Sequence, residues 1–374
     1  MKKIIVFMFF AVLFSLNVNA LSDVSAKSAI LINGTTGEVI FSKNVNEQLP
    51  MASTTKIMTA LLLAEKNTPQ KQVTVTKRMV SVEGSSMGLL PNDKVTYNDL
   101  LYGMLLASGN DAANSVAYLL GGSIEGFAKL MNSKAKEIGL LHTNFVTPSG
   151  LDDDNHYTTA RDMAILARFA MQNDAFRTAA SSKTAVLNYG NPPYRRQITN
   201  HNKLLNLYDG AIGVKTGFTK KSGRCLVSAA KRNEAYLIAV TLNAPNDWQD
   251  HAAMFDYGFE KLNLITLNNQ DDFLKIPVLS GDFNEVFVKL PKTTVAVSNE
   301  NQEDFCVQTI APDFLFAPIN KGEKIGKMIV KYKGEIISQK DLFCEKDISV
   351  LKTSKNFFQR FFEIYTLFLK QIRS

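Results

Sequence analysis

The chain has 374 residues, 45% of them hydrophobic and 21% charged, with a formal net charge of +7. This length predicts two domains with enough chain for a large core, and the composition is that of an ordinary globular protein. The basic residues form no stripe interleaved with aromatic side chains, so we expect no nucleic-acid partner.

The first 20 residues have the pattern of a secretory signal peptide. Lys2 and Lys3 precede an apolar run from Ile4 to Leu16, and the segment ends on the small residue Ala20. The alternative is an uncleaved membrane anchor, but the short apolar run and the small residue favour cleavage. Removal of the two lysines takes two charges from +7 and leaves +5, an excess that suits an anionic envelope or lipid surface.

The segment from residue 21 to 262 predicts strands and helices in mixed order. Two strands joined by a turn come first, at Ala29–Ile32 and Glu38–Ser42, and residues 73–75 look extended. Apolar residues at helical spacing then predict helices at Ile57–Ala64, Leu100–Ala107, Ala112–Leu120, Ile124–Ile138 and Ala160–Gln172. Thr96 with Asp99, and Thr159 with Asp162, are the start signals of the second and the last of these helices.

Downstream the apolar pattern changes to that of a sheet. The stretch Thr143–Tyr157 is polar and acidic and predicts a surface loop. Three strands and a closing helix then follow, at Ala211–Lys215, Arg224–Lys231, Tyr236–Asn243 and Trp248–Leu262. Helices that flank an antiparallel sheet define an α+β fold class.

From residue 263 to 347 the helical pattern is lost. Short alternating runs and glycine turns predict a small all-β domain, with strands at Phe287–Leu290, Thr294–Val297 and Met328–Tyr332. We find no catalytic motif in this segment and expect it to act as a spacer or a partner contact.

Three short motifs, in order, carry the predicted chemistry: Ser53-Thr54-Thr55-Lys56, Ser108-Gly109-Asn110 and Lys215-Thr216-Gly217. Ser53 and Lys56 are three residues apart at a helix start, so they share one helix face with Cβ atoms about 5–6 Å apart. A serine hydroxyl is a weak nucleophile until a base takes its proton, and a lysine is a base only when its pKa is lowered. Burial and the charge of Lys215 would both lower the pKa of Lys56.

The remaining motif residues have candidate roles around that pair. Ser108 would relay a proton to the leaving amine, and Asn110 would orient the lysine through its carbonyl and hold substrate through its amide. Gly217 would let a substrate backbone approach an edge strand closely. The backbone N–H groups of Ser53 and Phe218 are candidates for an oxyanion hole.

Each motif alone also has a purely structural explanation. Ser53 suits a helix N-cap, Ser108–Asn110 a helix end with a glycine stop, and Lys215–Gly217 a strand leading into a turn. Ser-x-x-Lys recurs from residues 133, 228 and 349, whereas Lys-Thr-Gly occurs once, and both later motifs follow only Ser53. The ordered set therefore predicts a serine acyl-transfer enzyme with a lysine base.

With these motifs the chain resembles the low-molecular-mass penicillin-binding proteins, the serine-type D-alanyl-D-alanine carboxypeptidase family. The resemblance covers roughly residues 25 to 345, and further similar segments are Leu31–Asn33, Thr36–Val39, Leu49–Ala52, Gly84–Met87, Thr147–Leu151, His156–Ala160, Asp162–Ala164 and Ala317–Glu323. It implies a β-lactamase/transpeptidase-like catalytic domain at residues 21–262 and a non-catalytic all-β domain at residues 263–347.

The resemblance also implies the reaction. Ser53 would be the acyl-ester nucleophile and Lys56 its base, Ser108 and Asn110 would form the second element, and Lys215 with Thr216 would bind the terminal carboxylate of the substrate. The implied substrate is a peptidoglycan stem peptide ending in D-Ala-D-Ala, with β-lactams as covalent inhibitors and no metal or organic cofactor. Phe218 departs from the pattern, because several relatives carry histidine there. The further basic residue that relatives use for the carboxylate stays open among Lys220, Lys221 and Arg224.

The histidines and cysteines predict no metal site. No His-Glu-x-x-His set occurs, and we expect a structural or exposed position for His142, His156, His201 and His251. The acidic run Asp152–Asp154 predicts a solvated turn. Cys225 predicts a core residue, and a disulfide between Cys306 and Cys344 stays open.

Residues 348–374 predict a membrane-associating tail. Between Asn356 and Ile372 a polar stripe at helical spacing borders a wide apolar face. The run is too short and too charged for a span of about 20 apolar residues, but it fits an amphipathic helix on anionic lipid. The alternative is a helix docked on the β domain. We expect an exported protein, peripherally anchored at the outer face of the cytoplasmic membrane.

Three rival functions stay open. A β-lactamase of the same superfamily would require rapid deacylation, and the helical register offers no Glu-x-x-Leu-Asn equivalent. A D,D-endopeptidase differs in substrate length, which the sequence does not reveal. A non-catalytic penicillin-binding sensor or wall scaffold would have a defective site, and the intact Ser53, Lys56, Ser108 and Lys215 argue against it.

Overall fold

A computed structural model describes residue 21, residues 24–268, 272–298 and 304–351, and residues 361, 362 and 365 of the C-terminal tail. The signal peptide predicted at residues 1–20 lies outside the described residues, as does most of the predicted tail.

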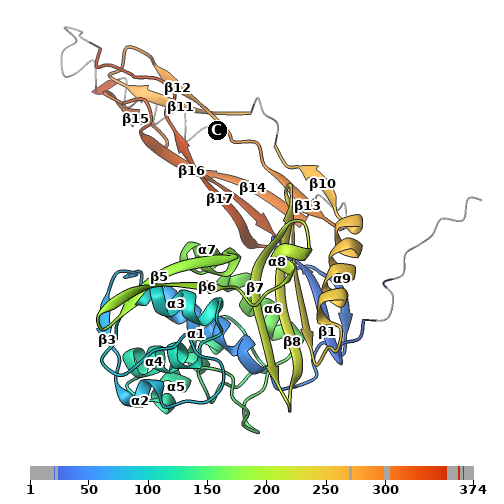
Figure 1. The fold of residues 1–374 in the computed structure, drawn as a ribbon. Coiled ribbons are helices and arrows are strands. Elements are labelled where there is room, and N and C mark those ends of the chain that lie inside the picture. Colours follow the sequence, from blue (N-terminus) through green and yellow to red (C-terminus); the bar gives the residue numbers. More distant parts are fainter. Residues whose placement is uncertain are drawn as a thin grey trace, which may run out of the picture.

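A five-stranded antiparallel sheet forms the centre of the N-terminal region (Figure 1). Its order is β2 (Val39–Lys43), β1 (Ser28–Asn33), β9 (Ala235–Leu242), β8 (Gly223–Arg232) and β7 (Ala211–Thr219). The five predicted strands of this region are confirmed. Strand β7 lies at one edge of the sheet and continues four residues beyond its predicted end, so the Lys-Thr-Gly motif lies within the strand.

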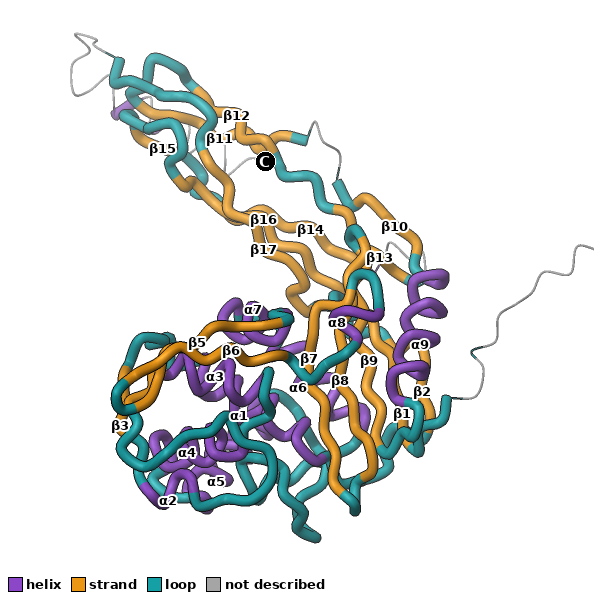
Figure 2. The backbone as a smooth tube through the Cα atoms, in the orientation of Figure 1, coloured by secondary structure: helices purple, strands orange, loops and turns teal. Residues whose placement is uncertain are grey.

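Helices cover both faces of this sheet, and the central strands are apolar at nearly every position for that reason. In β1, Ala29 and Leu31 pack toward α9 (Asp247–Lys261), whereas Ile30 and Ile32 belong to the core beneath α6 (Ala160–Ala170). Figure 2 shows α9 on one side of the sheet and the other long helices gathered on the opposite side.

His251 of α9 is a polar contact inside one of these cores. Its Nε2 lies 2.9 Å from the Thr241 hydroxyl, and its Nδ1 forms a hydrogen bond with the Ser228 hydroxyl. Complete burial lowers the pKa of His251 to about 3, so the ring is neutral. The histidine is structural, as the sequence predicts.

The remaining elements of the N-terminal region form a helical layer and a small sheet beside β7. The helices are η1 (Ala52–Thr55, a 3-10 turn), α1 (Lys56–Ala64), α2 (Lys77–Val80), α3 (Tyr97–Leu105), α4 (Asn110–Gly121), α5 (Ile124–Glu137), α7 (Asp174–Ser181) and α8 (Leu204–Leu207). The small sheet consists of β3 (Gln72–Thr74), β4 (Lys94–Thr96), β5 (Thr184–Gly190) and β6 (Pro193–Thr199).

The predicted helix starts hold in detail. Thr96 Oγ1 accepts a hydrogen bond from the Asp99 N–H at 3.1 Å, and Thr159 does the same for Asp162. The cap places the start of α3 at Tyr97, three residues before the apolar run that predicted it. The β5–β6 hairpin was not predicted, because Val186 and Tyr194 point outward and break the alternation of apolar and polar residues.

The C-terminal β domain has its own core and extends away from the N-terminal region (Figure 1). Its strands are β10 (Asn263–Thr266), β11 (Phe273–Leu279), β12 (Glu285–Lys289), β13 (Thr294–Val297), β14 (Phe305–Ile310), β15 (Leu315–Phe316), β16 (Lys324–Tyr332) and β17 (Glu335–Phe343). The all-β prediction is confirmed. The sequence left a disulfide between Cys306 and Cys344 open, and the structure contains none between these two described residues. Both residues are free thiols, Cys306 exposed and Cys344 buried.

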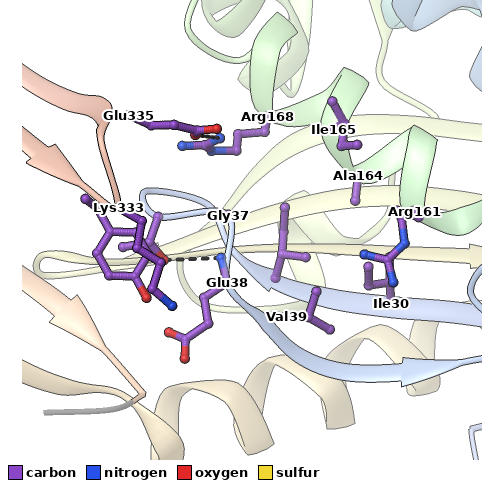
Figure 3. A pocket seen from close by; sticks show the side chains of 13 residues that line it. Ile30, Gly37, Glu38, Val39, Arg161, Ala164, Ile165, Arg168, Lys333 and Glu335 are labelled. Carbon is purple, nitrogen blue, oxygen red and sulfur yellow. Dashed lines mark hydrogen bonds and ion pairs between the residues drawn. The ribbon is translucent and has the colours of Figure 1, made fainter. Parts of the chain in front are cut away.

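The turn between β1 and β2 joins the two parts of the molecule. The buried Asn33 amide donates to the Ala296 carbonyl of β13 at 2.7 Å, while its oxygen accepts from the Thr35 and Thr36 N–H groups. Beside it, Arg168 Nη1 lies 3.6 Å from Glu335 Oε2 of the β domain, and both side chains line a cavity of about 480 Å³ (Figure 3). None of the motif residues lines this cavity.

Candidate active site

The predicted nucleophile Ser53 lies in η1, where the chain enters α1. Ala52, immediately before it, has a φ of +47°, a left-handed conformation that costs roughly 1–2 kcal/mol for a residue with a side chain. Lys56 opens α1 one turn later, and its Nζ lies 2.8 Å from Ser53 Oγ. Lys56 is completely buried whereas Ser53 lines a cavity, so the base is withdrawn from water while the nucleophile is accessible.

Two further acceptors surround the Lys56 amine. Asn110 Oδ1 lies 2.7 Å from Nζ and the Ser149 carbonyl oxygen lies 2.8 Å away. Neither oxygen can donate a hydrogen bond, so each must receive a hydrogen from the amine. A neutral amine has two hydrogens, and these two acceptors take both. Its lone pair is then left facing the Ser53 hydroxyl, which is the geometry that a general base requires.

The surroundings of Lys56 favour this neutral form. Its pKa is held well below the usual lysine value, first by complete burial and then by the positive charge of Lys215. The negative charge of Asp111 acts in the opposite direction. Both causes that the sequence predicted are therefore present, and Asp111 is an opposing charge that it did not predict.

The segment Thr143–Tyr157 packs partly against η1 and Lys56, which corrects its prediction as a surface loop. It lacks regular helix or strand, as expected, but Ser149 and Gly150 are buried against η1. A Cβ on Gly150 would lie 1.8 Å from the Ala52 carbonyl oxygen, and the φ of Gly150 is +86°, so this position requires glycine. The acidic run Asp152–Asp154 next to Gly150 is mostly exposed, and for that reason the sequence pattern suggested that the whole loop was exposed.

His156 supports η1 from the end of the same loop. Its Nδ1 accepts a hydrogen bond from the Val146 N–H at 2.9 Å, so Nε2 carries the proton and donates to Thr55 Oγ1 at 2.8 Å. Burial lowers the pKa of His156 to about 4, and the ring is neutral at physiological pH. The residue is structural, as the sequence predicts.

The second motif lies in the short connection between α3 and α4. Helix α3 ends at Leu105 rather than Ala107, and Ser108 has a φ of +57°, so a strained turn presents this serine to the cavity. The Ser108 hydroxyl has no hydrogen-bond partner among the described residues. The Asn110 amide nitrogen donates to the Glu83 carbonyl at 2.6 Å. That contact uses one of the two amide hydrogens and leaves the second for the substrate contact that the sequence predicts.

The third motif lies on β7, and Thr216, Gly217 and Phe218 line the same cavity as Ser53. Along β7 the side chains alternate, with Lys215 buried and Phe218 65% exposed. Lys215 Nζ donates to the Thr216 carbonyl at 2.8 Å, and burial lowers the pKa of Lys215 to about 7. A Cβ on Gly217 would lie 2.9 Å from the Ser53 nitrogen, so the bare backbone of β7 packs directly against the nucleophile turn.

Five of the predicted site residues line a cavity of about 340 Å³, whereas the buried Lys56, Asn110 and Lys215 do not line it. It is lined by Ser53, Ser85, Ser108, His201, Lys203, Thr216, Gly217, Phe218, Arg224, Asp247 and Trp248. Of the three basic residues left open by the sequence, only Arg224 lines it. Lys221 instead forms an exposed ion pair with Asp154. No sequence motif pointed to His201, Lys203, Asp247 or Trp248, because they come from segments without a recognisable signal.

Arg224 is held in place from two sides. Its Nε donates to Asp247 Oδ1 at 2.9 Å and its Nη2 lies 2.7 Å from the same oxygen. The guanidinium also lies over the Trp248 ring, 5.5 Å from the ring centre. One carboxylate oxygen leaves part of the guanidinium fork unused, so Arg224 can still bind a second anion.

Within the described residues, no group of three or more His, Cys, Asp or Glu side chains is placed to hold a metal ion. The cavity is lined by hydroxyls, the His201 ring and two cationic side chains, and its one carboxylate, Asp247, is bound to Arg224; the hydroxyls and cations can donate hydrogen bonds. Such donors stabilise anionic groups of a substrate or transition state.

Comparisons with known proteins agree with this geometry. A family model described as D-alanyl-D-alanine carboxypeptidase matches residues 15–246, and one described as penicillin-binding protein 5, C-terminal domain, matches residues 259–350. D-alanyl-D-alanine carboxypeptidase DacF of Bacillus subtilis (strain 168) is 34% identical over 334 residues, which cover 86% of this chain and 86% of that protein.

Solved structures show the same fold. Penicillin binding protein 5 from Haemophilus influenzae aligns with a TM-score of 0.62 and 26% identity, over 87% of this chain and 98% of that one. The Streptomyces K15 DD-transpeptidase aligns with a TM-score of 0.61 and 33% identity, over 64% and 98%. The transpeptidase-like fold and the C-terminal β domain expected from the resemblance are confirmed. These matches show that the chain belongs to the D-alanyl-D-alanine carboxypeptidase family of serine hydrolases.

Proposed function

We propose that the protein is a serine D,D-carboxypeptidase that removes the terminal D-alanine from peptidoglycan stem pentapeptides through an acyl-enzyme on Ser53. The observation that supports this most directly is the environment of Lys56. Two acceptor oxygens direct its hydrogens away from Ser53, and burial next to Lys215 lowers its pKa and so favours the neutral amine.

The first half of the reaction follows from these positions. The Ser53 hydroxyl passes its proton to Lys56 Nζ, and Ser53 Oγ attacks the carbonyl carbon between the two terminal D-alanines. The N–H groups of Ser53 and Phe218 stabilise the resulting oxyanion. The C–N bond then breaks, the proton returns through Ser108 to the leaving amine, and D-alanine departs. In the second half, water attacks the ester and regenerates the Ser53 hydroxyl.

The substrate carboxylate is assigned to Lys215, Thr216 and Arg224. Arg224 is the choice among the three basic candidates because it lines the cavity and is oriented by Asp247 and Trp248. A guanidinium that is held rigid loses little conformational freedom when it binds a carboxylate. Penicillin carries both a reactive amide and a carboxylate, so the same groups would direct its acylation of Ser53.

One assay separates this function from its rivals. The protein is incubated with a pentapeptide ending in D-Ala-D-Ala, with a cross-linked muropeptide dimer and with a chromogenic β-lactam. Release of D-alanine with slow β-lactam turnover supports the carboxypeptidase, whereas cleavage of the dimer alone supports an endopeptidase. Fast β-lactam turnover without D-alanine supports a β-lactamase. Labelling without any product supports a non-catalytic sensor. Ser53→Ala should lose the label, and retention of a covalent label would contradict the nucleophile assignment.

The location of the protein is proposed from its two ends. We infer export by the signal peptide and peripheral attachment to an anionic membrane surface through the amphipathic tail. The described tail residues Phe361, Phe362 and Tyr365 are helical and exposed, as a lipid-facing surface would be. No helix within the described ranges is long and apolar enough to span a bilayer. Truncation after Leu351, which keeps Ile348 in the β-domain core, should release the exported protein into the soluble fraction, and unchanged membrane sedimentation would refute the anchor.

A further inference from the structure

Asp111 is a buried carboxylate beside the site that the reaction does not use directly. It follows Asn110 at the start of α4 and is only 2% exposed. Its Oδ1 accepts hydrogen bonds from the N–H groups of Met87 and Ala112, at 3.0 and 2.9 Å. Its Oδ2 accepts from the Ser86 hydroxyl at 2.6 Å and from the Gly88 and Leu89 N–H groups at 3.1 and 3.0 Å. Neutral donors alone therefore satisfy the charge.

Four of these five donors belong to one turn, residues 86–89. The turn continues from Glu83 and Ser85, whose carbonyls accept from the side chain and the backbone N–H of Asn110, at 2.6 and 2.7 Å. The Glu83 contact identifies which end of the Asn110 amide faces Lys56, since it occupies the nitrogen and leaves the oxygen for the amine. Asn110 is thus held by a segment that Asp111 itself holds.

We propose that Asp111 is a positioning residue: its carboxylate anchors the 86–89 turn against α4, and the adjoining Glu83 and Ser85 thereby aim the Asn110 oxygen at Lys56. The inference rests on the proposed function, because it assigns Asp111 to the alignment of the acylation base. Asp111 would contact neither substrate nor the reacting atoms.

The charge of Asp111 has a second effect on the same base. The charged and titratable groups packed around this region include Lys56, Lys215 on β7, Tyr189 on β5, Arg196 on β6 and the buried Asp93, which lies 4.0 Å from Arg196. Lys215 lowers the pKa of Lys56 and Asp111 raises it. A neutral residue at position 111 therefore lowers the pKa of Lys56 further, and the base becomes active at lower pH.

The test measures the rate of Ser53 acylation by benzylpenicillin as a function of pH in the intact protein. In Asp111→Asn the side-chain nitrogen faces donors that need an acceptor, so the turn loosens. We expect the plateau rate to fall at least about tenfold, because small misplacements of catalytic groups are costly. We also expect the rise of rate with pH to move to lower pH, since the opposing negative charge is gone.

Two further variants separate positioning from charge and from folding. Ser86→Ala removes one donor but keeps the carboxylate, so the plateau should fall while the pH of the rise stays unchanged. Asp99→Asn is the matched control, because Asp99 is a buried helix-start carboxylate that contacts Thr96 and not the turn. It should lower the unfolding temperature and leave both kinetic features unchanged.

The outcomes are distinct. If Asp111→Asn keeps the wild-type plateau and pH profile, or if Ser86→Ala acylates at the wild-type rate, the inference is wrong. Should Asp111→Asn fail to fold, Ser86→Ala alone decides. If the wild-type protein is not acylated at all, the proposed function fails first, which a Ser53→Ala sample run in parallel identifies.

Discussion

Gly150→Ala tests whether the close approach of the 143–157 loop to η1 aligns the base. The new Cβ would lie 1.8 Å from the Ala52 carbonyl oxygen and 2.8 Å from Thr55 Oγ1, so the loop and η1 must move apart by about 1 Å. Ser149, the neighbouring residue, supplies one of the two oxygens that take hydrogens from Lys56. A displacement of about 1 Å in a catalytic group costs roughly 100-fold in rate, and we expect that loss in Ser53 acylation.

A matched control variant separates the effect of the close contact at Gly150 from the cost of placing alanine in a left-handed backbone conformation. Gly139 has a φ of +81°, close to that of Gly150, but a Cβ there would meet nothing within 4 Å. Gly139→Ala therefore carries only the conformational cost of about 1–2 kcal/mol, visible as a shift of a few degrees in Tm.

The assay for both variants is the acylation rate with a chromogenic β-lactam, together with thermal unfolding. Gly139→Ala should acylate at the wild-type rate. If Gly150→Ala acylates within about twofold of Gly139→Ala at temperatures where both are folded, the contact does not position the base, and the reasoning from Ser149 to Lys56 is refuted.

Three more predictions follow from other contacts. Arg224→Gln should reduce kcat/KM for the pentapeptide by about 10–100-fold, the loss expected when a charged hydrogen bond is removed. The control Lys221→Gln loses only an exposed ion pair and should change kcat/KM less than about twofold. Equal effects of the two variants in steady-state assays would contradict the assignment of Arg224. His251 and His156 are buried and neutral, and their pKa values of about 3 and 4 lie below the value of about 6.5 in the unfolded chain, so their contribution to stability is complete above pH 6.5. As the pH falls below about 6.5, each lowers the free energy of unfolding by roughly 1.4 kcal/mol per pH unit. In urea unfolding at several pH values, His251→Asn should show about half the wild-type slope of unfolding free energy against pH, and an unchanged slope would argue against a neutral His251. Asn33→Ala should destabilise the protein by about 1–3 kcal/mol and expose the β-domain junction to limited proteolysis. Glu335→Gln, at the exposed end of the Arg168 ion pair, should do neither. Identical digestion patterns for the two variants would show that Asn33 does not hold the β domain to the N-terminal region.

The contact between Ser53 and Lys56 could be predicted because its geometry is local. Ser53 and Lys56 are three residues apart, and helical geometry alone brings their side chains together. The helix-start signals at Thr96 and Thr159 worked for the same reason, since each cap is a contact within four residues. The apolar strands of the central sheet were also readable, because burial on both faces leaves a continuous hydrophobic run.

The features that the sequence did not predict depend on contacts between residues far apart in the chain. The 143–157 segment is polar enough to suggest a surface loop, and only its packing against η1 shows that Ser149 directs Lys56. The hydrogen bond from the Asn110 amide nitrogen to the Glu83 carbonyl, 27 residues earlier in the chain, could not be predicted either. No spacing rule relates these residues.

The sequence alone determined the order of the three motifs, the helical register of Ser53 and Lys56 and the change from helices to a β domain. These features depend on neighbours a few residues apart. The charge state of Lys56, the choice of Arg224 and the role of Asp111 were decided only by the tertiary structure. A lysine loses its charge through burial and through charges that approach in space, and these come from α4 and β7, far along the chain from α1.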